Sequence, residues 1–210
     1  SEDSFYQMLL ELVNERDSLS TKSVPLIVTK GLSNKCEIFY DGFKNPNKRL
    51  ITNDDQWSSN EALAQLDSTL HYELIIYDND PAFMLDVLRN LRSGSVSYSL
   101  FATEYQLFNS GITNDNFTRE SEVICAMSSY LSYEDLNTLL FVEAFRSHFG
   151  TEPNQYAIRG YDIADYHIQR HLYGGVPMRG ILLGFDFTQD SQNRWVELRR
   201  FENFEWKLLR

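Results

Sequence analysis

Short apolar runs alternate with amphipathic helical patterns from residue 24 to residue 172, and this alternation restricts the fold more than any other feature. Residues 24–29 form a short apolar run of strand length, typical of a strand buried on both faces, and residues 73–77, with the sequence ELIIY, are expected to form another strand. A helical pattern with Pro81 in its first turn follows residues 73–77. Strands that alternate with helices usually pair in parallel, because each helix carries the chain back across the sheet. The order predicts an α/β fold, a three-layer α/β/α sandwich with parallel sheets.

The other expected elements follow from hydrophobic periodicity and from capping residues. Helices are expected at residues 4–16, 34–45, 58–70, 103–108 and 136–149 and from about residue 160, and further strands at 48–52, 96–102 and 123–127. Beyond Gly174 the rhythm changes. Residues 182–187 and 195–201 are expected to form a long antiparallel hairpin, and residues 204–208 an edge strand.

Leu88, Leu140 and Phe145 are predicted core residues, because each lies on the apolar stripe of a helix that should flank the sheet. The helix that contains Leu140 and Phe145 is expected to end at Gly150, in a left-handed cap.

The charge of the chain argues against two classes of partner. Nineteen basic and thirty acidic residues among 210 give a formal net charge of −11, which repels nucleic acid and anionic membranes. No run approaches the roughly 18 apolar residues of a membrane helix, so no membrane insertion is expected. With 42% apolar residues, the chain can bury a substantial core.

Cys36 and Cys125 are the only cysteines, and each has apolar neighbours. Buried free thiols are the expectation, and a disulfide remains the alternative.

The sequence contains no motif for catalysis or for a cofactor. A G-x-S-x-G nucleophile, a cysteine–histidine signature and a glycine-rich phosphate loop are all absent from it. His167 and His171 are one helical turn apart, but no third ligand is spaced to complete a metal site. We therefore expect a non-catalytic protein with neither metal nor cofactor.

In open parallel sheets, ligands bind beyond the carboxyl ends of the strands. That rule selects residues that follow three expected strands: Asp78, Asn79, Glu104, Tyr105, Ser128 and Ser129. Asp78 has two interpretations, a helix cap or a carboxylate that faces a ligand amine. Ser128 and Ser129 are either hydroxyl donors to a ligand or part of a plain polar loop. Two carboxylates in this set favour an amine-bearing or neutral polar ligand.

One stretch carries a resemblance to a known family. It runs from Phe141 to Tyr166 and includes Phe149-Gly150-Thr151-Glu152-Pro153, Tyr156-Ala157 and Gly160-Tyr161-Asp162-Ile163. This pattern resembles the late segment of type I periplasmic binding proteins, the branched-chain amino-acid receptor family, and most closely their envelope-associated members in Bacteroidetes-type bacteria. A looser match in the order of elements extends from about residue 24 to residue 187.

The resemblance implies a division of the chain. Residues 1–95 resemble the second lobe of the family, residues 96–176 the later part of the first lobe, and residues 177–210 a β-hairpin return segment. The opening strand and helix pairs of the first lobe have no match here. Asp162 is expected to be structural, near the start of its helix, and Tyr161 is expected to line the cleft.

The resemblance also implies a function. We expect a ligand-binding or sensory module of the periplasm or cell envelope, which binds a small, amino-acid-like molecule between two lobes. The alternative is a scaffold or protein-interaction domain that keeps the fold without a ligand, with Phe201, Phe204 and Trp206 as its contact surface. A homo-oligomer and an envelope protein partner both remain open.

Overall fold

The computed structural model describes residues 2–17, 23–52, 61, 63–110, 121–189 and 191–209. The chain divides into two compact units. The sheet unit consists of Glu2–Ala126 and Leu198–Arg210, and the helical unit of Met127–Glu197.

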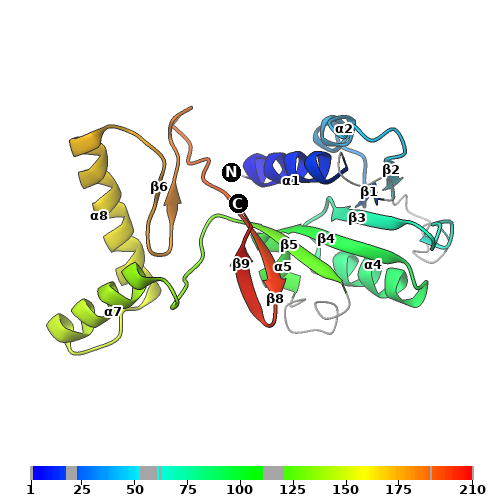
Figure 1. Ribbon diagram of the computed structural model, residues 1–210. Coiled ribbons are helices and arrows are strands. Elements are labelled where there is room, and N and C mark those ends of the chain that lie inside the picture. The colour runs from blue at the N-terminus through cyan, green and yellow to red at the C-terminus, as the bar shows by residue number, and fades with distance from the viewer. Residues whose placement is uncertain are drawn as a thin grey trace. The chain divides into compact units, whose positions relative to one another are not determined.

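The sheet unit is a three-layer α/β/α sandwich, as the sequence predicts. Its seven strands lie in the order β2-β1-β3-β4-β5-β8-β9, and the ladders from β2 through β5 are parallel. Helices α1 and α2 cover one face, and α4 and α5 cover the other (Figure 1). The strands are β1 (Ser23–Thr29), β2 (Arg49–Thr52), β3 (His71–Ile76), β4 (Ser97–Thr103), β5 (Glu122–Met127), β8 (Glu197–Glu202) and β9 (Glu205–Leu208). The helices are α1 (Glu2–Asp17), α2 (Asn34–Asp41), α4 (Pro81–Ser93) and α5 (Glu104–Ser110).

Strands β1 and β4 lie inside the sheet and are covered on both faces. Every residue of β1 is buried, and so is every residue of β4 after Ser97. The sequence of β4 alternates apolar and polar residues, which is typical of a half-exposed strand, but Ser99 and Thr103 are each 2% exposed. Helices on both sides exclude water from them. Leu88 is fully buried on α4, as predicted.

A network of charged and polar side chains joins the amino ends of three parallel strands. Glu122 accepts hydrogen bonds from Arg16 (2.7 Å) and from the Ser99 hydroxyl (2.8 Å). Nδ1 of His71 lies 2.8 Å from the Ser97 hydroxyl, and Nε2 lies 2.9 Å from that of Ser99. Because Ser99 donates its proton to Glu122, it accepts from His71, which places the imidazole proton on Nε2. The network thus ties α1 to β3, β4 and β5.

The helical unit contains α7 (Leu136–Phe149), α8 (Gln155–Tyr173) and a short antiparallel pair, β6 (Met178–Arg179) with β7 (Gly184–Phe185). Asp135 caps the start of α7, accepting from two backbone N–H groups. Gly150 ends α7 in the left-handed region at φ 68°, as the sequence predicts.

Two sequence predictions about the second half of the chain are wrong. Helix α8 begins at Gln155, not near Gly160, because Asn154 caps it and accepts from two backbone N–H groups. Residues 182–187 do not pair with 195–201. The hairpin forms instead between β8 and β9, and β9 is the edge strand predicted at residues 204–208.

Leu140 is not a core residue of this structure. It is 55% exposed, and Phe145, on the same helix, is only half-buried. The buried side of α7 holds Thr138 and Val142. Helical periodicity identified the apolar positions, but not which of them are covered.

Cys36 and Cys125 are buried free thiols, as predicted. Burial raises the pKa of both thiols above the ordinary value, and nearby Glu37 and Glu104 add to the effect.

The unit boundary at residues 126 and 127 differs from the expected segment boundary near residue 95. Strand β4 pairs with β3 along five residues, so both sides of residue 95 belong to one sheet. The match of each segment to a lobe of the family stays a prediction. Of the helix expected at residues 58–70, residues 58–60 and 62 lie outside the described residues, residues 61 and 63 are helical, and residues 64–70 form turns and irregular backbone instead.

Candidate functional site

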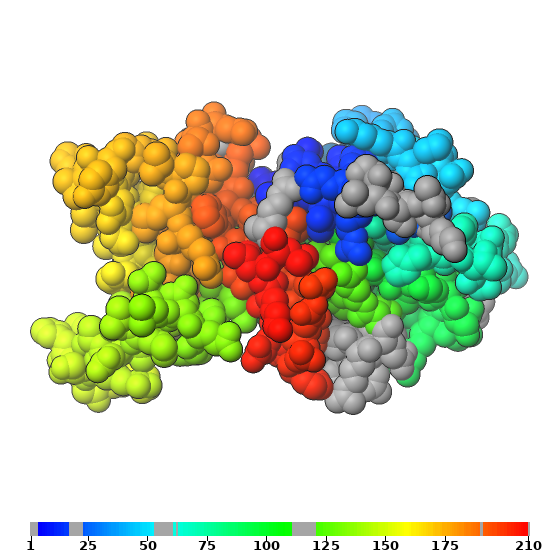
Figure 2. Space-filling view, in the orientation of Figure 1, coloured from blue at the N-terminus to red at the C-terminus, as the bar shows by residue number. Residues whose placement is uncertain are grey.

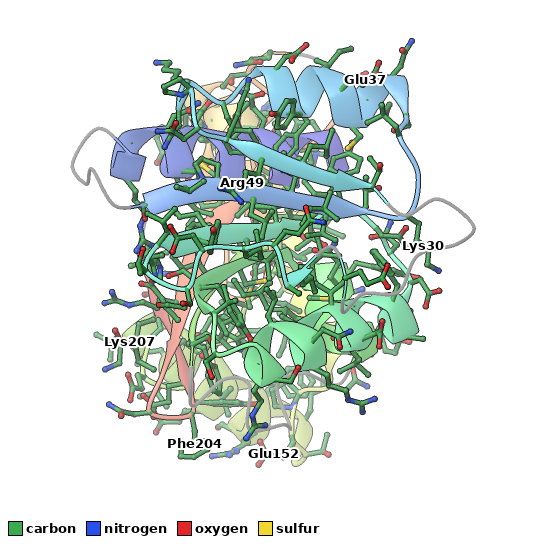
Figure 3. All side chains as sticks on the ribbon, turned by 90° about the vertical axis from the view of Figure 1, so that its right-hand side faces the viewer. Lys30, Glu37, Arg49, Glu152, Phe204 and Lys207 are labelled. Carbon is green, nitrogen blue, oxygen red and sulfur yellow. The ribbon has the colours of Figure 1, made fainter. Side chains whose placement is uncertain are left out.

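The first part of the candidate site lies at one edge of the sheet unit. Strands β1, β3 and β4 are parallel neighbours, so the residues that follow them gather at the same edge. Asp78 and Asn79 follow β3, while Glu104 and Tyr105 open α5 directly after β4. The structure therefore brings these four predicted residues to a common edge. Figure 3 marks Lys30 beyond the end of β1.

Asp78 and Asp80 both accept backbone hydrogen bonds in the turn between β3 and α4. The N-cap of α4 is Asp80, whose side chain accepts from the Ala82 N–H at 2.8 Å. Asp78 is not the cap, but its Oδ1 accepts from the Asp80 N–H at 2.8 Å and so shapes the turn before it. Asp78 is half-buried and Asn79 is exposed.

Lys30 forms an ion pair with Asp80 across this edge. The hydrogen bond from Lys30 and the Ala82 N–H hold the pKa of Asp80 below its ordinary value. The same hydrogen bond raises the pKa of Lys30. Asp78, Asp80 and Glu104 together outnumber Lys30, so this set of residues has a negative formal charge.

Gln106 positions the first turn of α5, and the sequence analysis did not single it out. Its Nε2 donates to the carbonyls of Ile76 (2.6 Å) and Asp78 (2.8 Å), and its Oε1 accepts from the Thr103 N–H (2.9 Å). Gln106 is 3% exposed. The sequence feature that could have identified it is a polar amide next to Leu107 on the buried face of a short helix. Through Gln106, the start of α5 is fixed against the end of β3.

The second part of the candidate site belongs to the helical unit. Ser128 and Ser129 follow β5 and are half-buried. Ser129 forms an antiparallel bridge with Leu183, and the Tyr130 N–H donates to the Leu182 carbonyl at 2.9 Å. The plain-loop interpretation of Ser128 and Ser129 therefore needs amendment, because this segment is paired with residues 182–183.

Asp162 holds the same loop from the other side. It is fully buried, and its carboxylate accepts from the N–H groups of Ile181 (2.7 Å), Leu182 (2.8 Å) and Leu183 (2.8 Å). A Cβ at Gly180 would lie 2.6 Å from this carboxylate, so glycine is needed there. Asp162 is structural, as expected.

Tyr161 lies beside a cavity of about 610 Å³ between α7 and α8. Its ring centroid is 4.7 Å from that of Phe141. Polar groups on the cavity wall include Asp135, Asp165 and Arg179. Arg179 pairs with Asp135 at 3.7 Å and with Glu197 at 2.9 Å.

The predicted site residues thus fall in two groups. Asp78, Asn79, Glu104 and Tyr105 share one edge of the sheet unit, and Ser128, Ser129 and Tyr161 belong to the helical unit. Whether they bind one ligand stays a prediction. Within the described residues, no group of three or more His, Cys, Asp or Glu side chains is arranged to hold a metal ion.

Comparison with solved structures identifies the fold. The ABC transporter substrate-binding protein from Desulfitobacterium hafniense, solved in complex with Leu, matches 97% of this chain and 65% of its own, with a TM-score of 0.57 and 16% identity. A putative branched-chain amino acid ABC transporter from Rhodospirillum rubrum matches 95% of this chain and 64% of its own, with a TM-score of 0.58 and 12% identity. Full-length LpoA from Haemophilus influenzae matches 98% of this chain but 39% of its own, with a TM-score of 0.53 and 10% identity.

The chain therefore has the type I periplasmic binding protein fold, and it spans less than two thirds of the length of the two ABC-transporter structures. No protein-family model matches the sequence. No curated protein matches it either. Among the described residues, no helix is long and apolar enough to cross a bilayer.

Proposed function

We propose that this protein is a non-catalytic ligand-binding module of a bacterial cell envelope, and that it binds a small, polar, amino-acid-like molecule at the carboxyl edge of its sheet unit. The observation that carries the proposal is the meeting of Asp78, Asn79, Glu104 and Tyr105 at that edge. Parallel sheets bind ligands in this place because the loops after neighbouring strands converge there. The fold supports the binding role as an analogy, since substrate-binding proteins share it.

The charges at this edge favour an amine-bearing or neutral ligand over a phosphate. Lys30 is already paired with Asp80, and Asp78 and Glu104 add two further carboxylates. An ammonium group placed against Asp78 gains a charge-assisted hydrogen bond, whereas an anion is repelled. Tyr105, 58% exposed, offers an aromatic ring and a hydroxyl group at the same edge. Ser128, Ser129 and Tyr161 remain predicted contributors from the helical unit.

Calorimetric titration with a panel of amino acids and sugars tests the proposal. We expect a basic or neutral amino acid to bind, and Asp78→Asn to weaken its affinity at least tenfold because the charged acceptor is lost. Asp86→Asn is the matched control, since it removes the same charge from an exposed position of α4. Equal affinity of parent and Asp78→Asn would reject the site.

A protein-interaction role is the second candidate, and the hairpin of β8 and β9 favours it. Phe204 lies at the tip of this hairpin, 72% exposed, where Figure 3 labels it. Aromatic side chains that protrude in this way commonly anchor protein contacts. If none of the amino acids or sugars in the panel gives a heat of binding, the protein-interaction role is favoured over ligand binding.

A further inference from the structure

Helix α8 and the chain that follows it enclose a second cavity in the helical unit, with a volume of about 440 Å³. This volume lies within the range of about 300 to 1,000 Å³ that is typical of small-molecule sites. Figure 2 shows α8 in yellow and the following chain in orange, both at the surface. We call this space the α8 cavity. The residues that line it include Tyr166, His167 and Arg170 of α8 and Phe185, Phe187 and Ser191 of the following chain.

The floor of the α8 cavity is aromatic. Tyr166 and Phe185 are buried, and their rings stack with centroids 4.6 Å apart and an interplanar angle of 16°. The ring of Phe187 is half-buried, and its centroid lies 5.5 Å from that of Tyr166. Three neighbouring rings form an apolar surface on which another aromatic ring or a branched hydrocarbon packs well.

The rim of the α8 cavity is basic. His167 and Arg170 are both exposed there, three residues apart on the same side of the helix. Arg170 forms no ion pair with any described residue, whereas Arg179 in the same unit pairs with Glu197 at 2.9 Å. Among the described residues, no acidic side chain lines this cavity. An anion at the rim therefore meets the guanidinium group without competition from a carboxylate.

The floor and the rim together recognise two different chemical groups. A guanidinium group holds a carboxylate through two parallel N–H···O hydrogen bonds. The hydroxyl group of Ser191 provides a further donor at the same cavity. The aromatic floor offers no hydrogen-bonding partner to a polar molecule, but it removes a hydrocarbon group from water.

We propose that the α8 cavity binds a small organic acid, a monocarboxylate with an aromatic or branched hydrocarbon group. The hydrocarbon group lies on the rings of Tyr166, Phe185 and Phe187, and the carboxylate accepts hydrogen bonds from Arg170. This site shares no residue with the edge of the sheet unit, and it takes a ligand of the opposite charge. The two binding proposals can therefore fail separately.

The polar rim favours a small acid over three other occupants. A packed protein segment would remove His167, Arg170 and Ser191 from water without giving them partners, which costs free energy. An inorganic anion would leave the aromatic floor in contact with water. An amine would be repelled by the guanidinium group of Arg170.

A titration of the isotopically labelled 210-residue chain with 3-phenylpropionate, followed by amide NMR, tests the proposal. We expect saturable shifts at residues 163–170, 185–187 and 191, and none at residues 76–80 or 104–106. Two comparison compounds separate the contributions of charge and ring. Phenylpropanamide keeps the ring without the charge, propionate keeps the charge without the ring, and each should bind at least tenfold more weakly.

Variants of α8 test the role of Arg170. Arg170→Gln should weaken the binding of 3-phenylpropionate at least tenfold, and Arg170→Lys should weaken it less, because lysine keeps the charge but not the paired donors. Phe187→Ala should also weaken it, through loss of part of the floor. The matched control is Arg159→Gln, which removes the same charge from an exposed position of α8 that does not line the cavity. It should bind like the parent.

Four results would overturn the proposal. The first is the absence of shifts at 3-phenylpropionate concentrations up to about 10 mM. The second is equal affinity of the parent and Arg170→Gln, and the third is equal affinity for the acid and its amide. The fourth is a set of shifts confined to Tyr173 and Val176, which would place the compound in the neighbouring cavity of about 280 Å³ that Arg170 also lines. Shifts at residues 76–80 alone would move the acid to the sheet unit and reject the α8 cavity.

Discussion

The carboxylate of Asp162 accepts hydrogen bonds from the backbone of residues 181–183, as the carbonyl groups of a neighbouring strand would. Its two oxygens satisfy the N–H groups of Ile181, Leu182 and Leu183, which fixes the loop that pairs with Ser129. Buried polar groups require such partners because an unsatisfied N–H group is costly. The resemblance to the binding-protein family implies a structural role for Asp162 near the start of its helix; the structural role is confirmed, but α8 begins at Gln155, so Asp162 lies two turns into the helix. The three donors could not be predicted, because they lie 19 to 21 residues away.

Replacing Asp162 with Ala should destabilise the helical unit by about 3 kcal/mol or more, because three buried N–H groups lose a charged acceptor. Urea unfolding measures the change, and faster amide exchange at residues 181–183 locates it. Asp165→Ala, one turn along the same helix and less buried, should cost much less. Equal losses in the two variants would contradict the role assigned to Asp162.

His71 makes the sheet unit sensitive to acid. Burial lowers the pKa of His71, and the positive charge of Arg16 lowers it further, while Glu122 offsets part of the effect. For Glu122, burial alone would raise the pKa, but hydrogen bonds from Arg16 and Ser99 and the charges of Arg16 and Arg200 bring it below its ordinary value. Because the pKa values of His71 and Glu122 are both lower in the folded protein, each residue stabilises the folded state more at higher pH.

Stability should fall as the pH drops from 7.5 to 5.5. The neutral form of His71 contributes fully above the ordinary histidine pKa of 6.5, and this contribution is lost as the pH falls through the lower pKa of the folded state. The loss from Glu122 begins only below 4.5, so His71 dominates this window. Melting temperatures across the range should therefore change less in His71→Gln than in the parent. His148→Gln, at an exposed position of α7, should behave like the parent.

At the scale of elements, hydrophobic periodicity predicted most helices and strands, and local capping decided their ends. Asp80 and Gly150 mark boundaries that agree with the sequence. The start of α8 was misplaced because Asn154, rather than the glycine six residues later, provides the cap. The pairing of β8 with β9 was missed because its turn residues, Asn203 and Phe204, lack the glycine that marks such turns.

That turn contains a strained residue. Asn203 and Phe204 both have positive φ angles, 52° and 66°. This conformation suits Asn and Gly but not an aromatic residue, whose Cβ is crowded there. Phe204→Gly should therefore stabilise the sheet unit by about 1 kcal/mol, measured by thermal or urea unfolding.

Phe204→Ala provides the control for this turn. It removes the same ring but keeps a Cβ at positive φ, so it should give no such gain. If both variants are more stable than the parent by the same amount, the exposed aromatic ring of Phe204 is destabilising, and the backbone conformation is not.

At the scale of the whole molecule, the order of elements was enough to predict the fold. The sequence places six candidate residues after parallel strands, and the structure brings four of them to one edge of the sheet unit. The boundary between the units could not be found from composition, because β3, β4 and β5 continue one sheet through residue 126.

The order of strands also determines what a break in the chain would do. The helical unit is an insertion between β5 and β8, and these two strands are neighbours in the sheet. A backbone cut at Gly174 would therefore separate the polypeptide into two pieces that still share one sheet. Strands β8 and β9 would stay on the shorter piece, bound to β5 by non-covalent contacts, which include the ion pair of Arg200 with Glu122 at 3.5 Å. The fold is thus suited to fragment complementation, and exchange of the hairpin between two copies gives it a direct route to domain swapping.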